Sequence, residues 1–77
     1  DADPMLATGA TGDAVRRLQR ALDACGVDLA VDGVFGTETR RAVRRFQAEH
    51  GLVRDGVAGS RTWARLRAVM QERARAA

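Results

Sequence analysis

The chain has 77 residues, of which 45% are hydrophobic and 30% are charged, a length and balance that suit one small globular domain. Its formal charge is +3, all thirteen basic residues are arginine, and its single cysteine excludes both an internal disulfide and a thiolate metal site. One tryptophan, two phenylalanines and no tyrosine argue against a stacking platform for single-stranded nucleic acid, and no apolar run is long enough to predict membrane insertion.

Residues 1–12 contain a proline and two glycines and show little periodicity, which predicts an irregular leading segment. Leu6 is the residue of this segment that we expect to reach the core. A helical spacing begins at Asp13, whose charge suits the positive first turn of a helix. The residues on its apolar face are Val15, Leu18, Leu22 and Cys25. Gly26 followed by Val27 predicts the end of this helix, with the glycine in the left-handed conformation and the valine packing back.

A second helix is predicted over about 37–50, and it should end as the first does because Gly51 is followed by Leu52. A third helix is predicted from residue 60 to at least residue 69. The residues expected to face the core are Thr39, either Ala42 or Val43, Phe46 and His50 in the second helix, and Trp63, Leu66, Val69 and Met70 in the third. No segment alternates with period two, so we predict an all-α, compact three-helix bundle. It forms a single domain over residues 1–77, with its core over about 4–70, a fraying tail over 71–77, and no metal or cofactor.

Two partial repeats are the most informative feature of the sequence. The pattern D-G-V-x-G-x-x-T at 32–39 recurs at 55–62, and VRRLQ at 15–19 recurs as VRRFQ at 43–47. Two partial copies are too few for a solenoid. The repeats therefore predict a bundle with pseudo-symmetric halves and two Asp-Gly loops.

Each Asp-Gly loop is predicted to be a turn that leads into a helix. The aspartate can accept hydrogen bonds from backbone N–H groups two residues on, and the glycines allow positive φ and a sharp turn. The residues expected to shape the loops are Asp32, Gly33, Gly36, Asp55, Gly56 and Gly59. Val34 and Val57 are expected to tuck inward. Gln19 and Gln47 occupy matching positions in the helices, and a buried amide needs hydrogen-bond partners, so we expect each to bond backbone groups of an Asp-Gly loop.

The repeats lie within three longer motifs. These are G-x-x-G-D-x-V-x-x-L-Q-x-x-L at 9–22, D-G-x-F-G-x-x-T-x-x-A-V-x-x-F-Q at 32–47 and G-L-x-x-D-G-x-x-G-x-x-T-W-x-x-L at 51–66. Together they resemble the peptidoglycan-binding domain of bacterial cell-wall enzymes. The resemblance implies a non-catalytic module that binds peptidoglycan outside the cytoplasm and targets a covalently linked hydrolase, such as an amidase, peptidase or transglycosylase. A start at Asp1 rather than methionine is what we expect of a domain excised from such an enzyme.

We expect the ligand to lie in a groove bordered by the two Asp-Gly loops and the front of the second helix. The predicted contact residues are Phe35, Arg40, Arg44 and Arg61. Arginine can clamp the free carboxylates of peptidoglycan stem peptides with paired hydrogen bonds. An equally weighted alternative is that the arginines form solvated faces paired with Asp23, Glu38 and Glu49. Trp63 is expected in the core rather than as a platform for a sugar.

Two other classes of function remain open at this stage. Three helices with basic faces could describe a helix-turn-helix domain that binds nucleic acid. Ten interspersed acidic residues argue against this class, as do helix connections of about eight residues in place of the usual three- to four-residue turn. The other class is a protein-docking module in a secretion or spore-coat assembly, because a fold does not fix its ligand.

Overall fold

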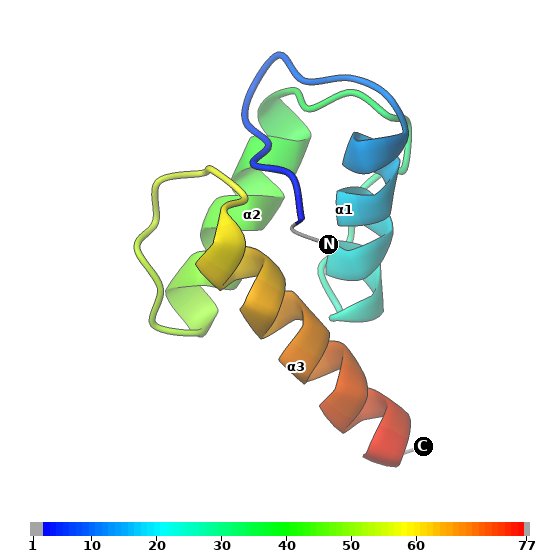
Figure 1. Cartoon of the computed structure of the whole chain (residues 1–77), viewed down its shortest axis with the longest axis vertical. Coiled ribbons are helices and arrows are strands. Elements are labelled where there is room, and N and C mark those ends of the chain that lie inside the picture. The colour runs from blue at the N-terminus through cyan, green and yellow to red at the C-terminus, as the bar shows by residue number, and fades with distance from the viewer. Residues whose placement is uncertain (1–2, 77) are drawn as a thin grey trace.

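The computed structural model describes residues 3–76 and contains within them three helices: α1 (Asp13–Ala24), α2 (Thr37–Glu49) and α3 (Ser60–Ala76). Figure 1 shows that α1 packs against both other helices, while the blue leading segment runs between α1 and α2. The described residues form no strand, only two isolated bridges. The predicted all-α, three-helix class is therefore confirmed.

The first two helices end in the same motif, as their glycines predict. Gly26 has φ +91°, and the Val27 N–H donates to the Leu22 carbonyl at 3.0 Å. Gly51 has φ +69°, and the Leu52 N–H donates to the Gln47 carbonyl, two positions before the last helical residue, at 2.8 Å. These bonds satisfy carbonyls that the helix itself leaves without partners, and they turn each chain end back toward the core.

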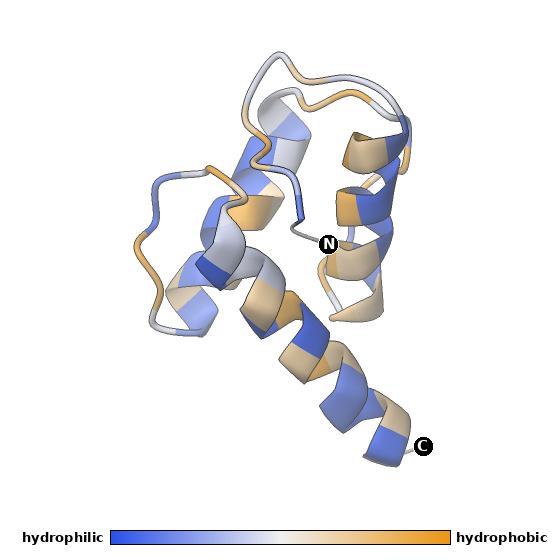
Figure 2. Cartoon of the chain, viewed as in Figure 1, coloured by the Kyte–Doolittle hydropathy of each residue, from blue (hydrophilic) through white to orange (hydrophobic). Residues whose placement is uncertain are grey.

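The third helix continues past residue 69 and reaches Ala76. Its last turns are mostly hydrophilic (Figure 2) and exposed. Arg73 and Arg75 lie in the final turn, where positive charge interacts favourably with the helix dipole. The segment expected to fray is thus helical over residues 71–76. Fraying itself stays a prediction, and Ala77 lies outside the described residues. No described helix combines the length and the apolar character needed to cross a bilayer.

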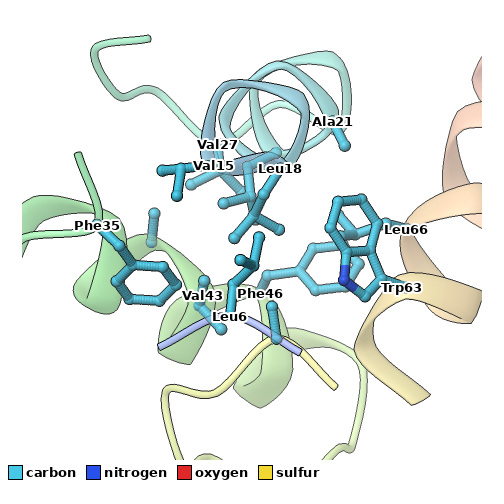
Figure 3. Close-up of a cluster of buried hydrophobic side chains, with 13 residues drawn as sticks. Leu6, Val15, Leu18, Ala21, Val27, Phe35, Val43, Phe46, Trp63 and Leu66 are labelled. Carbon is cyan, nitrogen blue, oxygen red and sulfur yellow. The ribbon is translucent and has the colours of Figure 1, made fainter. Parts of the chain in front are cut away.

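The core is a single cluster of apolar side chains drawn from all three helices and both loops (Figure 3). Its largest fully buried members are Phe35, Phe46, Leu18, Leu22 and Leu66. Burial of a side chain of this kind stabilises a fold by about 1.5–3 kcal/mol. Every helix contributes to this one cluster, so loss of packing at any point weakens the whole domain.

The inward residue of each Asp-Gly loop is the one after the predicted valine. Val34 is 50% exposed, whereas Phe35 is 1% exposed and Ala58 is fully buried; Val57 is half-buried. The expectation that the valines anchor the loops is therefore wrong for Val34. The aspartate and first glycine bend the chain so that the fourth residue of the loop, rather than the third, points at the core.

The leading segment ties both loops together through backbone hydrogen bonds. Leu6 exchanges two bonds with Ala58, at 3.1 and 2.8 Å. Gly9 donates to the Phe35 carbonyl at 3.0 Å, and the Phe35 N–H donates to the Ala10 carbonyl at 2.9 Å. Leu6 is buried, as predicted. The segment therefore holds the two halves of the domain in register.

Candidate functional site

A buried glutamine locks the first Asp-Gly loop. The Gln19 side-chain oxygen accepts hydrogen bonds from the N–H groups of Asp32 and Gly33 at 3.0 and 2.9 Å. Its nitrogen donates to the Asp32 carboxylate, the Val34 carbonyl and the Thr39 hydroxyl at 2.9–3.1 Å. The Asp32 carboxylate in turn accepts the Val34 N–H at 3.0 Å. One side chain thus fixes both the loop and the first turn of α2.

The second loop repeats this arrangement around Gln47. The Gln47 nitrogen donates to the Asp55 carboxylate, the Val57 carbonyl and the Thr62 hydroxyl at 3.0–3.1 Å. Its oxygen accepts the Gly56 N–H at 3.1 Å, and Asp55 accepts the Val57 N–H at 2.9 Å. The predicted structural role of both glutamines is confirmed, and the pseudo-symmetry extends to individual hydrogen bonds.

These hydrogen bonds lower the pKa of both aspartates. For Asp32 the largest cause is the Val34 N–H, followed by the Gln19 amide. For Asp55 the Val57 N–H is the largest cause; partial burial opposes it, and Gln47 adds to it. Donors that favour the charged form of a carboxyl keep it ionised. Both aspartates therefore shape their loops as carboxylates at neutral pH.

Arginine side chains lie across the first glycine of each loop. A Cβ atom at Gly33 would meet the Arg16 guanidinium at 3.0 Å. A Cβ atom at Gly56 would meet the Cγ atoms of Arg40 and Arg44 at 3.0 and 3.3 Å. Arg16 and Arg44 hold the same position in the repeated VRRLQ and VRRFQ motifs, whereas Arg40 has no arginine counterpart in the first half. The second loop is therefore the more basic of the two.

A groove of about 410 Å³ lies beside the second loop and the first turn of α3. We call it the second-loop groove; its lining residues are Met5, Gln47, Gly51, Leu52, Val53, Asp55, Val57, Gly59, Ser60, Arg61 and Thr62. Met5 and Val53 are each 76% exposed. Arg61 is the one cation among the lining residues. The groove thus joins exposed apolar surface to a guanidinium and to polar groups of the locked loop.

The structure brings together some of the predicted contact residues and separates others. Arg61 lines the second-loop groove, and the stems of Arg40 and Arg44 lie against the same loop at Gly56. Phe35 is buried, so its expected contact with a ligand is wrong: the ring belongs to the core. Of the predicted loop-shaping residues, Asp55 and Gly59 line the groove, whereas the first-loop residues Asp32, Gly33 and Gly36 do not.

The arginines divide into paired and unpaired groups. Ion pairs join Arg16 to Asp13 at 2.7 Å, Arg17 to Asp3 at 2.8 Å, Arg67 to Asp3, and Arg45 to Glu49 at 3.8 Å. Glu49 is thus a partner as expected, but Asp23 and Glu38 form no such pair within residues 3–76. Within the same residues, no carboxylate pairs with Arg40, Arg44 or Arg61.

The exposed apolar residues of the groove, Met5 and Val53, were not predicted as site residues. Met5 follows a proline and Val53 lies two residues after a helix-ending glycine, where sequence alone indicates only loop. The signal that could have identified Met5 and Val53 is that neither apolar residue falls on the apolar face of a predicted helix. Among the described residues, no cluster of three or more histidine, cysteine, aspartate or glutamate side chains could hold a metal ion.

The fold and its two glutamine-locked loops define a class of small helical domain built from a duplicated loop–helix unit. Residues 11–66 match the family described as "Putative peptidoglycan binding domain". The chain belongs to this family. The resemblance drawn from the three sequence motifs is therefore confirmed.

Known relatives carry this domain as part of a larger enzyme. The zinc D-Ala-D-Ala carboxypeptidase of Streptomyces albus G is 46% identical over 61 residues, which cover 75% of this chain and 24% of that protein. The crystal structure of the Burkholderia AP3 phage endolysin has a TM-score of 0.80 and 49% identity, covering 82% of this chain and 24% of that one. The structure of the SleB N-terminal domain has the same TM-score with 40% identity, covering 88% of this chain and 96% of that domain.

Proposed function

We propose that this domain is a non-catalytic module that binds peptidoglycan and holds an attached cell-wall hydrolase on the bacterial wall, outside the cytoplasm. Membership of the family supports the ligand class. The relatives that are cell-wall enzymes support the attachment, since this chain spans only 24% of the carboxypeptidase. We propose no nucleic-acid or membrane partner.

The observation that carries the proposal is the unpaired basic surface at the second loop. Arg40, Arg44 and Arg61 are exposed and have no carboxylate partner within residues 3–76. Guanidinium groups donate paired hydrogen bonds to carboxylates, and stem peptides carry free carboxylates. An exposed pair of this kind contributes about 0.2–1 kcal/mol, so each contact is weak and several must act together. Weak contacts suit a module that lets its enzyme move along the wall.

The test is retention of the purified domain on peptidoglycan sacculi stripped of teichoic acid, over a salt series, with duplex DNA in parallel. We expect retention on sacculi that weakens gradually with salt, and none on DNA. The double variant Arg40→Glu/Arg44→Glu should lose most retention, because both stems border the second loop. Glutamate keeps the Cγ atoms that pack on Gly56, so the fold is preserved.

The matched control is Arg41→Glu/Arg45→Glu, which makes the same charge change with the same spacing on the same helix. It should keep most of its retention, because neither residue borders a loop glycine or lines the groove. Equal losses in the two variants would mean that net charge alone drives binding. Tight retention on DNA that falls steeply with salt would instead indicate phosphate neutralisation and would overturn the proposal. Binding to neither material would favour a protein-docking module.

A further inference from the structure

A second groove, of about 530 Å³, lies between α1 and α3. We call it the α1–α3 groove; its lining residues are Asp3, Arg17, Arg20, Ala21, Ala24, Trp63, Arg67 and Met70. It shares no residue with the second-loop groove. It is therefore a separate surface that the proposed wall contacts do not use.

A carboxylate of the chain itself sits in the α1–α3 groove. The two oxygens of Asp3 are divided between two guanidiniums: Oδ1 pairs with Arg17 at 2.8 Å, and Oδ2 pairs with Arg67. The Asp3 side chain is 18% exposed. Two cations that each take one oxygen of a planar group form the geometry of a carboxylate clamp. Asp3 thus stands in for the free carboxylate of a ligand.

The surroundings of the clamp indicate what else a ligand would offer. The Arg17 guanidinium lies 5.0 Å from the ring centroid of Trp63, which orients the cation over an aromatic face. The Trp63 indole N–H donates to the Pro4 carbonyl at 2.8 Å, so the same ring already binds a peptide backbone. Ala21, Ala24 and Met70 add apolar surface to the same groove.

The charge of the groove exceeds what Asp3 neutralises. Three arginines face one carboxylate, and Arg20 has no carboxylate partner among the described residues. Two positive charges therefore remain for a ligand. Because apolar side chains line the groove beside these charges, charge alone does not describe the site: it suits an anion attached to an apolar residue.

We propose that the α1–α3 groove binds the free carboxylate end of a short peptide with apolar side chains, and that Asp3 occupies this position until such an end displaces it. The chemistry matches the alanine-bearing end of a peptidoglycan stem peptide, and in that respect the inference rests on the proposed function. Bound peptide would lie against Trp63 and exchange Asp3 for its own carboxylate on Arg17 and Arg67. The domain would then recognise peptide ends at one groove and the wall more broadly at the other.

The experiment titrates the domain with acetyl-D-alanyl-D-alanine and with the same peptide as its C-terminal amide. Trp63 is the single tryptophan of the chain, so its fluorescence and its indole N–H resonance report directly from the groove. We expect a saturable change with the free carboxylate and none with the amide. Inorganic phosphate is the third probe; binding as strong as that of the peptide would overturn the carboxylate assignment.

Three variants give the titration its controls. Asp3→Asn removes the internal carboxylate and should tighten peptide binding roughly 3- to 10-fold. This is the gain expected when the state with Arg17 and Arg67 open to the peptide rises from a minor fraction to the whole population. Arg17→Gln/Arg67→Gln should abolish the saturable change. Arg65→Gln, an exposed arginine of α3 that lines neither groove, is the matched control and should bind as the parent does. Thermal melts of all variants verify the fold.

The outcomes separate this inference from the proposed function. If Asp3→Asn binds peptide no more tightly than the parent, Asp3 only anchors the leading segment to α1 and α3, and the inference is wrong. If peptide binding fails while sacculi still retain the domain, the inference alone fails. If sacculi do not retain the domain but the carboxylate peptide still binds and the amide does not, the groove assignment stands and wall targeting fails.

Discussion

Replacing Gln19 by methionine should remove the lock on the first loop without leaving a cavity. Methionine has nearly the same length and volume as glutamine, but it cannot make the hydrogen bonds of the amide. The substitution would leave the buried Gly33 N–H without its partner and would take the amide donor from Asp32. The Thr39 hydroxyl would keep its bond to the Val34 carbonyl at 3.3 Å.

The cost follows from these losses. A buried N–H left without a partner costs about 1–3 kcal/mol, and the lost amide hydrogen bonds to the Val34 carbonyl and the Thr39 hydroxyl contribute about 0.5–1.5 kcal/mol each. We therefore expect Gln19→Met to lower the free energy of unfolding by about 3–5 kcal/mol. A domain of this size has a total stability of about 4–12 kcal/mol. The loss is thus a large fraction of the total stability, and the variant should unfold at a much lower urea concentration than the parent.

Urea denaturation, followed by far-ultraviolet circular dichroism and by Trp63 fluorescence, measures this loss. The matched control is Gln71→Met, which makes the same chemical change at an exposed position of α3 and should shift the free energy by less than about 0.5 kcal/mol. Gln47→Met should cost slightly less than Gln19→Met, because Gln47 accepts one backbone N–H where Gln19 accepts two. A loss below about 1 kcal/mol at Gln19 would refute the reasoning that the amide network holds the loop.

Two further predictions concern the loops. The pKa values of Asp32 and Asp55 are lowered in the folded protein, so as the pH falls the unfolded chain binds protons before the folded chain does. The stabilisation from these two carboxylates is therefore complete above the usual aspartate pKa, and it is lost as the pH falls through the lowered pKa values. The urea midpoint of the parent should therefore drop as the pH falls, and it should drop less steeply in the double variant with asparagine at both positions. Equal pH dependence in the two proteins would show that these carboxylates are not its source. Gly56→Ala should destabilise more than Gly51→Ala, because both residues have positive φ but the new Cβ at Gly56 would meet the Arg40 stem at 3.0 Å, whereas Gly51 faces open space. Equal melting temperatures for the two variants would show that the arginine stem moves aside freely.

Local signals in the sequence were enough to predict the helices and their ends. The Gly26–Val27 stop lies directly after the helix end that it predicts. Gln19 and Gln47 could be matched because they occupy the same position in two copies of one motif. A buried amide with a fixed demand for partners, next to a loop rich in N–H groups, leaves few arrangements open. The two loop networks were therefore predictable in kind, although not bond by bond.

The features that the sequence did not predict depend on long-range geometry. Phe35 points into the core because of the angle through which the first glycine rotates the loop. Residue types alone do not determine that angle. The pairing of Leu6 with Ala58 uses backbone groups that every residue carries. The Asp3 clamp joins positions 14 and 64 residues apart, and nothing in the local pattern around Asp3 marks it as a partner of two helices.

The duplicated design separates stability from binding in a way that variants can address. Positions shared by the two halves, such as the glutamines and the loop aspartates, make closely matching hydrogen bonds in both copies and serve the fold. Positions where the halves differ carry the distinct chemistry: Arg16 is paired with Asp13, whereas its counterpart Arg44 has no such partner within residues 3–76 and stands beside Arg40. Substitutions at shared positions should therefore change the unfolding free energy, and substitutions where the copies diverge should change retention on the wall while leaving the melt nearly unchanged. A variant at Arg40 that lost stability in proportion to binding would remove this distinction.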